Sequence, residues 1–382
     1  MERLKRLFIA LLMVGATFTI LPDLGQAQLT PPILPAAGTS FTCSSLVKIS
    51  SRLGSAQPLK VSGHCVEDAT LGINDNRQNI TILGKGTGAC GDPANTTLTV
   101  SDPSESTIIN VRGTNITITG FEIFGLSSDP TVDNRRGIRA QRGGTLLVGR
   151  NTQGNGDPTI YLERSGVCIR DVGKAGIEAG TGSVVRVTNT EIKNVGGDGI
   201  SVTEGGIAEI GFTSGGEFGL TTDAFPGPGV SGPNNVHNTG GAGANINRNS
   251  AARIVGNTFA SNKNSGINVA TNSHADIADN LINGNGQFAV QVTDNSNVNL
   301  GTTGNTGCGA TNGTSCAGGT VALTGLANSV TVTNTTGAIR CVRSVMAGRQ
   351  TMDRAGTVGA GLLGNGGTAG TNTFTSCTSS LN

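Results

Sequence analysis

Apolar and polar residues alternate in short runs that recur every 23 residues in the second half of the chain. The repeat is plain when the stretches that start at residues 243, 266 and 289 are written beneath each other. Three apolar columns then align: Ala244, Ile267 and Val290; Ile246, Val269 and Val292; and Ile254, Ile277 and Leu300. Strict alternation over short runs is typical of strands with one buried face. The pattern therefore predicts three short strands, separated by turns, in each repeat.

Polar columns run beside the apolar ones and mark where the chain should bend. They comprise Asn249, Asn272 and Asn295, followed by Ser250, Ser273 and Ser296. Asparagine tolerates the left-handed backbone conformation, and its amide can hydrogen-bond along a stack of coils. Asn257 and Asn280 are expected to form a further ladder of this kind. We interpret these asparagines as structural because turn chemistry already accounts for them.

The same alternation extends toward the N-terminus, which makes a repetitive fold the simplest interpretation. It is found in residues 115–123, 137–149, 176–192 and 199–211. Coils that stack with their strands ~4.8 Å apart would turn the aliphatic columns into continuous inward ladders. The sequence therefore predicts an all-β protein, a single-stranded right-handed parallel β-helix with coils of about 23 residues.

Two other repeat architectures fit the sequence less well than a β-helix. A leucine-rich repeat has a similar period, but residues 243–300 contain only Leu281 and Leu300, and the columns prefer Ile, Val and Ala. A calcium-binding nonapeptide roll needs a tandem glycine-rich motif, whereas the run at 196–199 occurs once. Residue identity therefore disfavours both alternatives.

At this point the chain resembles the pectate-lyase-like superfamily of right-handed parallel β-helix proteins, over residues 58–340. The segments LKVSGHCVEDATL (59–71) and NITILGKG (79–86) look like the first strands of similar exported β-helices. Such a coil pattern is specific for fold and unspecific for activity. The resemblance implies that a polysaccharide-active member would use the outer face of one strand ladder, flanked by loops, as its cleft.

The two ends of the chain depart from the repeat. Residues 1–27 are expected to be an export signal, because three basic residues precede an apolar run of 15 residues, and a small-residue exit follows. A membrane anchor would need about 20 apolar residues. Residues 28–57 should form an N-terminal segment with a capping helix, since Leu46, Ile49 and Leu53 have helical spacing after a serine. Residues 341–382 would form a C-terminal cap or tail.

Four insertions interrupt the predicted β-helix, at residues 125–137, 149–158, 211–241 and 301–319. The last three follow similar strand–glycine exits, so they should project from one side of the stack. The first leaves from a different corner. Loops on a rigid scaffold are the usual place for binding. Decoration without function is an equally good interpretation, because loops also tolerate sequence drift.

Composition and charge narrow the range of functions. The chain has 26 basic and 25 acidic residues, and 23 of each remain when residues 1–27 are removed. This balance argues against nucleic-acid binding, which needs a basic face. With 60 glycines and no tryptophan, the core must be built from small aliphatic side chains.

The eight cysteines all follow residue 27 and could form disulfides in an oxidising compartment. Proximity in sequence favours the pairs Cys43–Cys65, Cys308–Cys316 and Cys341–Cys377, and leaves Cys90 and Cys168 unassigned. A metal site is disfavoured because no pair has C-x-x-C spacing and the three histidines are scattered.

The outward positions of the first strand ladder form a polar row with few charges. We expect substrate-binding residues there at Gln141, Ser201, Asn245, Asn268 and Gln291. The candidate catalytic residues are Arg139 and Glu178 on adjacent coils, with Asp171 and Asp198 at neighbouring turns. The alternative is an ordinary surface ion pair worth ~0–1 kcal/mol.

The resemblance implies specific chemistry that these candidates match poorly. A lyase of the group would show an acidic calcium cluster and a basic residue, and a hydrolase would show paired carboxylates. Neither pattern is present in the sequence. No cofactor is evident, and calcium stays an open alternative.

Export, the polar ladder and the loops together predict a secreted, periplasmic or cell-surface protein that interacts with carbohydrate. It would act on a polysaccharide as a lyase, hydrolase or epimerase. The alternative is a non-catalytic surface or matrix protein that displays adhesive loops. Polysaccharide is the expected partner, nucleic acid is not, no membrane span is expected after signal cleavage, and the sequence leaves the oligomeric state undetermined.

Overall fold

The computed structural model describes residues 38–149, 166–211, 234–278, 280–300, 328, 330, 334–348 and 372–381. Several predicted features lie outside these ranges. They are the export signal at 1–27, the insertions 149–158 (apart from Gly149) and 301–319, most of the insertion 211–241, and Cys308 and Cys316. Within them the chain folds into three parallel sheets, here called A, B and C.

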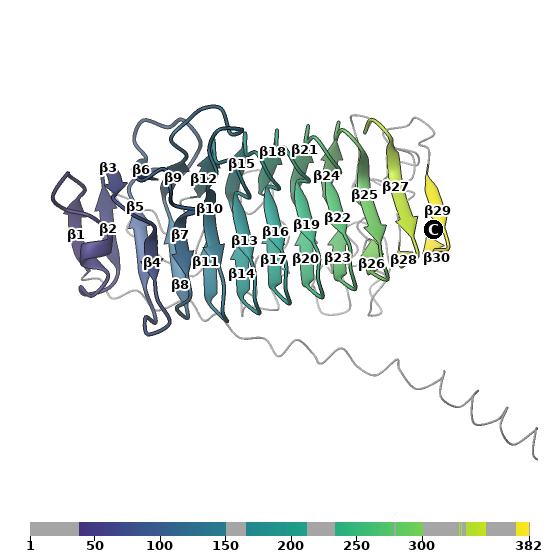
Figure 1. Ribbon diagram of the computed structural model, residues 1–382, viewed down its shortest axis with the longest axis horizontal. Helices are drawn as coiled ribbons and strands as arrows, with labels where there is room; N and C mark the ends of the chain where they lie inside the picture. Colours follow the sequence, from purple (N-terminus) through teal and green to yellow (C-terminus); the bar gives the residue numbers. More distant parts are fainter. Residues whose placement is uncertain are drawn as a thin grey trace, which may run out of the picture. The chain divides into compact units, whose positions relative to one another are not determined.

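The strands of each sheet stack in the order in which the coils follow one another (Figure 1). Sheet A contains β1 (Thr39–Thr42), β2 (Leu59–Ser62), β5 (Thr81–Gly84), β8 (Ile116–Thr119), β11 (Thr145–Val148), β14 (Val184–Val187), β17 (Ile207–Gly211), β20 (Ala251–Val255), β23 (His274–Ala278), β26 (Asn297–Leu300), β28 (Val345–Gly348) and β30 (Thr378–Leu381). Sheet B contains β3 (His64–Glu67), β6 (Thr96–Val100), β9 (Phe121–Phe124), β12 (Val167–Arg170), β15 (Thr190–Lys193), β18 (Asn235–His237), β21 (Thr258–Ala260) and β24 (Leu281–Asn283). Sheet C contains β4 (Leu71–Ile73), β7 (Thr107–Val111), β10 (Arg136–Ala140), β13 (Ile177–Ala179), β16 (Ile200–Val202), β19 (Ala244–Ile246), β22 (Ile267–Val269), β25 (Phe288–Thr293), β27 (Gly337–Val342) and β29 (Thr373–Thr375).

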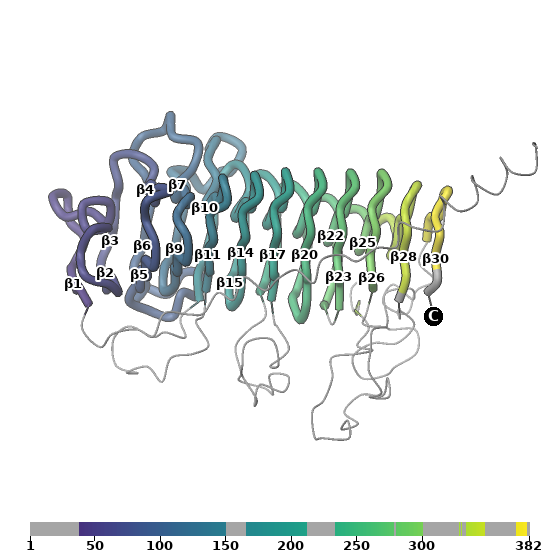
Figure 2. The backbone as a smooth tube through the Cα atoms, turned by 90° about the horizontal axis from the view of Figure 1, so that it is seen from below, coloured from purple at the N-terminus to yellow at the C-terminus, as the bar shows by residue number. Residues whose placement is uncertain are grey.

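From β4 to β18 the chain visits sheets C, A and B in turn, so that each coil contributes one strand to each sheet. Figure 2 shows these coils as successive rings. All strand pairs are parallel, and parallel crossovers are almost always right-handed. The predicted all-β, parallel β-helical fold is thereby confirmed.

The register of the strands agrees with the columns read from the sequence. Ala244 pairs with Ile267 and Ile267 with Val290, and Ile254 pairs with Ile277 in sheet A. These side chains are fully buried and form one continuous hydrophobic core. Because alternate strand positions point to opposite faces, the residues between them face outward.

Asparagine ladders hold the corners between the sheets. At the C-to-A corner, Asn249, Asn272 and Asn295 have φ values of 61°, 57° and 61°, the left-handed conformation expected of them. At the A-to-B corner, Asn257 Nδ2 donates to Asn280 Oδ1 over 2.9 Å, and both residues are buried. A third ladder links Asn262 to Asn285 at the B-to-C corner. These contacts satisfy backbone groups that would otherwise be buried unpaired.

The expected N-terminal capping helix is wrong. Residues 43–53 contain only the 3-10 turn η1 (Ser50–Arg52), and the side chain of Leu46 is 90% exposed. Backbone N–H groups of Ile49 and Ser50 bond to the carboxylate of Glu67 on β3, so tertiary contacts replace the helical hydrogen bonds. A segment this short gains little from helix formation alone. The first coil is instead covered by β1, which pairs with β2.

Disulfides join the two ends of the stack to their neighbours. Cys43 pairs with Cys65 and Cys341 with Cys377, as predicted, and Cys90 pairs with Cys168. Beyond residue 340 the chain continues the helix, because β28 pairs with β30 and β27 with β29.

Candidate functional site

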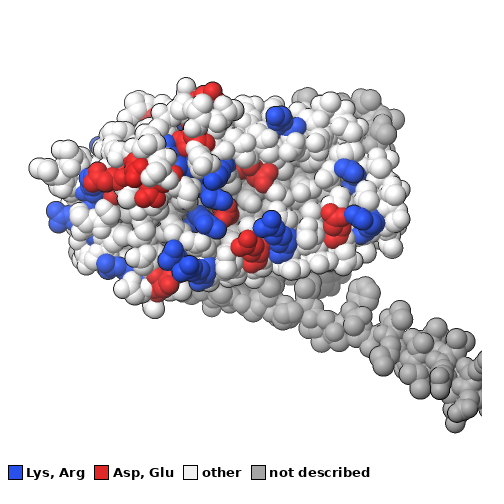
Figure 3. Space-filling model, in the orientation of Figure 1, with Lys and Arg blue, Asp and Glu red and all other residues white. Residues whose placement is uncertain are grey.

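The outer face of sheet C carries a row of polar side chains in one register. Strand pairing aligns Asn110, Arg139, Glu178, Ser201, Asn245, Asn268, Gln291 and Arg340 on successive strands. The residues on either side of each position point into the core. Figure 3 shows this face: charged side chains gather over the first coils and are sparser over the later ones. Four of the predicted positions, Ser201, Asn245, Asn268 and Gln291, therefore lie in one outward register.

Three side-chain amides in this row form a hydrogen-bonded ladder, which we call the amide ladder: Asn245, Asn268 and Gln291. Gln291 Nε2 donates to Asn268 Oδ1 over 3.0 Å, and Asn268 Nδ2 donates to Asn245 Oδ1 over 2.9 Å. The three side chains are partly buried. Each amide has two N–H donors and two acceptor lone pairs. The ladder uses one of each, so every rung keeps one donor and one acceptor for other partners.

Charged groups of opposite sign end the amide ladder and fix its direction. Asn245 Nδ2 donates to Asp198 Oδ2 over 2.8 Å, while Arg340 Nη1 donates to Gln291 Oε1 over 3.3 Å. A carboxylate only accepts and a guanidinium only donates, so each amide has one allowed orientation. The ladder therefore presents a preorganised row of donors and acceptors.

Asp198, at the end of the amide ladder, is a partly buried carboxyl group with two hydrogen-bond donors. Its Oδ1 also accepts a hydrogen bond from Ala242 N over 2.8 Å. Burial raises the pKa of Asp198, and the hydrogen bonds from Asn245 and Ala242 offset part of that effect. A carboxyl group with a raised pKa beside a row of hydrogen-bonding groups has the properties of a general acid or base.

Glu178 is held by two arginines. Arg139 Nε lies 2.7 Å from Glu178 Oε1, and Arg136 bonds to Glu178 Oε2. The Glu178 side chain is only 9% exposed. The predicted pairing of Arg139 with Glu178 is therefore present, and Arg136 joins it. Arg136 reaches Glu178 from three residues before Arg139 on β10, and it was not among the predicted candidates.

The four predicted catalytic residues do not form one cluster. Asp171 lies at the B-to-C corner, where it bonds to Arg170 and Asn194. Its contacts thus belong to the edge of sheet B, whereas Asp198 is joined to the amide ladder. Gln141 lies outside the row, two residues beyond Arg139, and its Nε2 donates to Asn110 Oδ1 over 2.9 Å. Ser201 lies half-buried in the row between Glu178 and Asn245.

Three of the four insertions leave from strands of sheet A, whereas the amide ladder is on sheet C. The insertions 149–158 and 211–241 both connect a strand of sheet A to a strand of sheet B, and the one at 301–319 also follows a sheet A strand. Residues 235–237, expected within an insertion, form β18. The segment 125–135 connects sheet B to sheet C and so adjoins the edge of sheet C.

A second charged group occupies the outer face of sheet B, and sequence reasoning missed it. His237 Nε2 lies 3.1 Å from Glu191 Oε1, and Lys193 Nζ lies 3.5 Å from the same oxygen. The hydrogen bond from His237 and the charge of Lys193 hold the pKa of Glu191 below its usual value against burial. Cys168 on β12 lies between Glu191 on β15 and Glu122 on β9. Glu122 forms an ion pair with Arg170. Aligning the third strand of each coil could have revealed this column.

No metal centre emerges from the part of the chain that the structure describes. Within it, no three His, Cys, Asp or Glu residues are grouped so that they could hold a metal ion. Calcium binding stays a prediction. Among the same residues, no helix is long and apolar enough to cross a membrane.

Comparisons with known proteins agree with the fold. A family model described as "Right handed beta helix region" matches residues 162–336. No curated protein matches the sequence. The chain is similar in structure to a periplasmic alginate epimerase, AlgG, solved as a point mutant, with 11% identity, a TM-score of 0.37 and coverage of 86% of this chain and 73% of that one. Together with the sheet topology, the family match supports a right-handed parallel β-helix.

Two further solved structures are similar at the same low level. The A-module of the mannuronan C-5 epimerase AlgE4 from Azotobacter vinelandii shares 12% identity at a TM-score of 0.36, covering 85% of this chain and 86% of that one. The enzymatically active domain of tailspike protein 2 from bacteriophage CBA120 shares 12% identity at a TM-score of 0.38, covering 87% of this chain but 43% of that one. At TM-scores below 0.5, these likenesses carry no argument about this chain.

Proposed function

We propose that the outer face of sheet C binds an extended polysaccharide whose chain lies along the amide ladder. The observation that carries this proposal is the fixed orientation of Asn245, Asn268 and Gln291, each with one donor and one acceptor to spare. A sugar hydroxyl also donates one hydrogen bond and accepts others, so it matches such a rung. Preorganised groups lose little side-chain entropy on binding.

Other classes of ligand fit this face less well. A nucleic acid needs a row of cations for its phosphates, and the rungs of the amide ladder are neutral. A protein partner is usually anchored by buried aromatic or arginine side chains at the centre of its interface. The row over β16, β19, β22 and β25 offers Ser201 and the three amides instead. Regularly spaced polar groups on strands ~4.8 Å apart suit a regular hydroxylated polymer.

A test of this proposal is to incubate the purified protein with a panel of neutral and acidic polysaccharides, with and without calcium, and to follow bound protein and chain cleavage together. Retention by at least one polysaccharide is the expected result. If no member of the panel is retained or altered, the proposal is wrong. Comparison of the samples with and without calcium also tests whether the protein needs calcium.

Turnover of the polysaccharide is a second candidate function, which the raised pKa of Asp198 favours. For a polysaccharide that the protein cleaves or epimerises, Asp198→Asn is expected to lower turnover by about 10²–10⁴-fold, the usual contribution of a general acid or base. The measurement is the initial rate at saturating polysaccharide. An unchanged rate would remove Asp198 from the chemistry.

Non-catalytic display is the competing interpretation, and the Arg136–Glu178–Arg139 cluster favours it. Each carboxylate oxygen of Glu178 is already engaged by a guanidinium group, which is the arrangement of a structural ion pair. Binding without any change of the polysaccharide would establish this form of the proposal. We also propose an extracytoplasmic location, since the three disulfides among the described residues need an oxidising compartment.

A further inference from the structure

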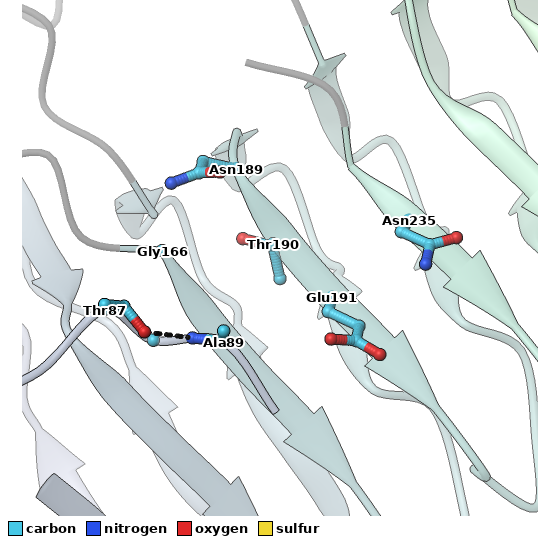
Figure 4. Close-up of a pocket in the computed structure, with 8 residues that line it drawn as sticks. Thr87, Ala89, Gly166, Asn189, Thr190, Glu191 and Asn235 are labelled. Atoms are coloured by element: carbon cyan, nitrogen blue, oxygen red, sulfur yellow. Dashed lines mark hydrogen bonds between the residues drawn. The ribbon is translucent and has the colours of Figure 1, made fainter. Parts of the chain in front are cut away.

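A small pocket opens on the outer side of sheet B, away from the amide ladder. Its volume is about 190 Å³, and it lies between the loop at Thr87–Ala89 and the strands β15 and β18 (Figure 4). The lining groups on the strand side are Gly166, Asn189, Thr190, Glu191 and Asn235. None of these residues belongs to the site proposed on sheet C.

The loop that forms one wall of the pocket is fastened to three neighbouring strands. Cys90 forms the disulfide to Cys168 on β12, and Cys90 N donates to Glu191 Oε2 over 3.4 Å on β15. Gly91 N donates to Glu122 Oε2 over 3.2 Å on β9. Strand pairing places Glu122, Cys168 and Glu191 side by side in one outward column. The wall is therefore fixed before any ligand arrives.

A glycine allows the loop backbone to approach the strand closely. Gly166 N donates to Thr87 O over 2.8 Å, which brings residue 88 against β12. Gly88 has a φ of +72°, and a Cβ atom there would lie 1.9 Å from Gly166 O. Only glycine fits this position, so the narrow join between loop and strand is built into the sequence.

The lining of the pocket selects for a neutral ligand with hydroxyl groups. Glu191 is the only charged residue among the described residues that line it, and Lys193 Nζ and His237 Nε2 both contact its Oε1. Glu191 Oε2 accepts one long hydrogen bond, from Cys90 N, and an ionised carboxylate oxygen can accept more than one, so it has acceptor capacity left. Asn235 is exposed and can both donate and accept. An anion would be repelled by Glu191, and a cation would compete with Lys193.

The volume sets the size of the ligand. The pocket has a volume of about 190 Å³. That is too small for a chain segment and suited to one ring. We propose that this pocket binds a single neutral sugar ring, as a free monosaccharide or as a chain end or branch. Its ligand class follows from its own lining, so the inference does not rest on the sheet C site.

The test is titration of the full-length protein with neutral monosaccharides, with glucosamine and glucuronate as charged counterparts, followed by ligand-observed NMR. Saturable binding of a neutral sugar is expected. Asn235→Ala should weaken it by about fivefold, since one hydrogen bond contributes ~1 kcal/mol. Thr258→Ala is the matched control, because Thr258 occupies the same outward column on the next strand, outside the pocket.

The outcomes separate this inference from the proposal for sheet C. Binding that is confined to the charged sugars, or that Asn235→Ala and Thr258→Ala affect equally, would overturn it. We expect a dissociation constant of about 1 mM for the neutral sugar. An absence of binding at about 50 mM sugar, far above that value, would therefore also overturn the inference. Comparison of a neutral chain carrying the same sugar at its end with the free monosaccharide identifies the source. None of these results alters the test of the amide ladder.

A second variant checks the wall rather than the lining. The double substitution Cys90→Ala with Cys168→Ala removes the covalent link between the loop and β12, leaves only hydrogen bonds to hold the wall, and is expected to weaken monosaccharide binding. Circular dichroism would confirm that the stacked coils persist. Full binding by this variant with the fold intact would show that the loop is not part of the site and would contradict the proposal.

Discussion

Replacing Asn280 with leucine is expected to destabilise the protein by about 3–5 kcal/mol, one of the two largest effects that we predict. Asn280 is fully buried, and its Oδ1 accepts from both Asn257 N and Asn257 Nδ2. Its Nδ2 donates to Ile254 O, among others. Leucine has a similar size but leaves these groups buried and unpaired, at about 1–3 kcal/mol each. Chemical denaturation monitored by circular dichroism measures the loss.

The exposed asparagine ladder at the C-to-A corner, which contains Asn272 and Asn295, supplies the control for this prediction. Asn272→Gly removes an exposed amide that accepts from Asn295, and glycine keeps the left-handed conformation at that residue. The expected change is below about 1 kcal/mol. Equal losses for Asn280→Leu and Asn272→Gly would contradict the idea that burial of the ladder, rather than its mere presence, stabilises the stack.

Asp133→Ala is expected to cost about 3–5 kcal/mol, because it leaves a buried guanidinium without its counter-charge. Arg135 is 2% exposed and donates to both carboxylate oxygens of Asp133, over 2.9 and 2.6 Å. Arg135 Nη1 also donates to Val100 O over 2.7 Å. This pair anchors the segment that joins β9 to β10. Thermal or urea denaturation of the variant measures the effect.

The same ion pair predicts a dependence of stability on pH. Burial opposes ionisation of Asp133, but the hydrogen bonds from Arg135 and from the backbone of Leu126 outweigh it and lower its pKa. A lowered folded-state pKa contributes stability above the unfolded value near 3.9, and that stability is lost as the pH falls through the folded pKa. Asp133→Ala should therefore flatten the loss of stability below about pH 4.

Asp68→Ala is the control for the Asp133 predictions. Asp68 pairs with Lys48, but its side chain is 83% exposed. Exposed ion pairs contribute about 0–1 kcal/mol, so this variant should resemble the wild type at neutral pH. If both aspartate variants lose the same stability, burial of the Asp133–Arg135 pair is not the cause.

The fold could be read from the sequence because the repeat carries its own register. Once Ala244, Ile267 and Val290 align in one column, strand pairing and the inward face follow for every coil with the same period. The polar corners were equally legible, since left-handed turns favour asparagine at Asn249 and Asn272. The amide ladder was predicted as a row, although its hydrogen bonds and its charged ends were not.

Features that depend on long-range contacts could not be read in this way. Cys90 and Cys168 are 78 residues apart, so proximity in sequence gave no reason to pair them. His237 follows a long insertion, and its register with Glu191 becomes visible only when β18 pairs with β15. The N-terminal helix was wrongly predicted because the helical spacing of three apolar residues does not reveal Glu67, which accepts hydrogen bonds from the backbone of Ile49 and Ser50 and lies on the strand β3.

Binding of a polysaccharide by a variant of the amide ladder tests the central claim most directly. The double substitution Asn268→Ala with Gln291→Ala removes two rungs, and Asn297→Ala removes an exposed amide on sheet A as the control. With the polysaccharide that the wild type retains, we predict at least about tenfold weaker binding for the double variant and wild-type binding for the control. Unchanged binding by the double variant, or an equal loss for Asn297→Ala, would contradict the assignment of sheet C as the polysaccharide-binding face.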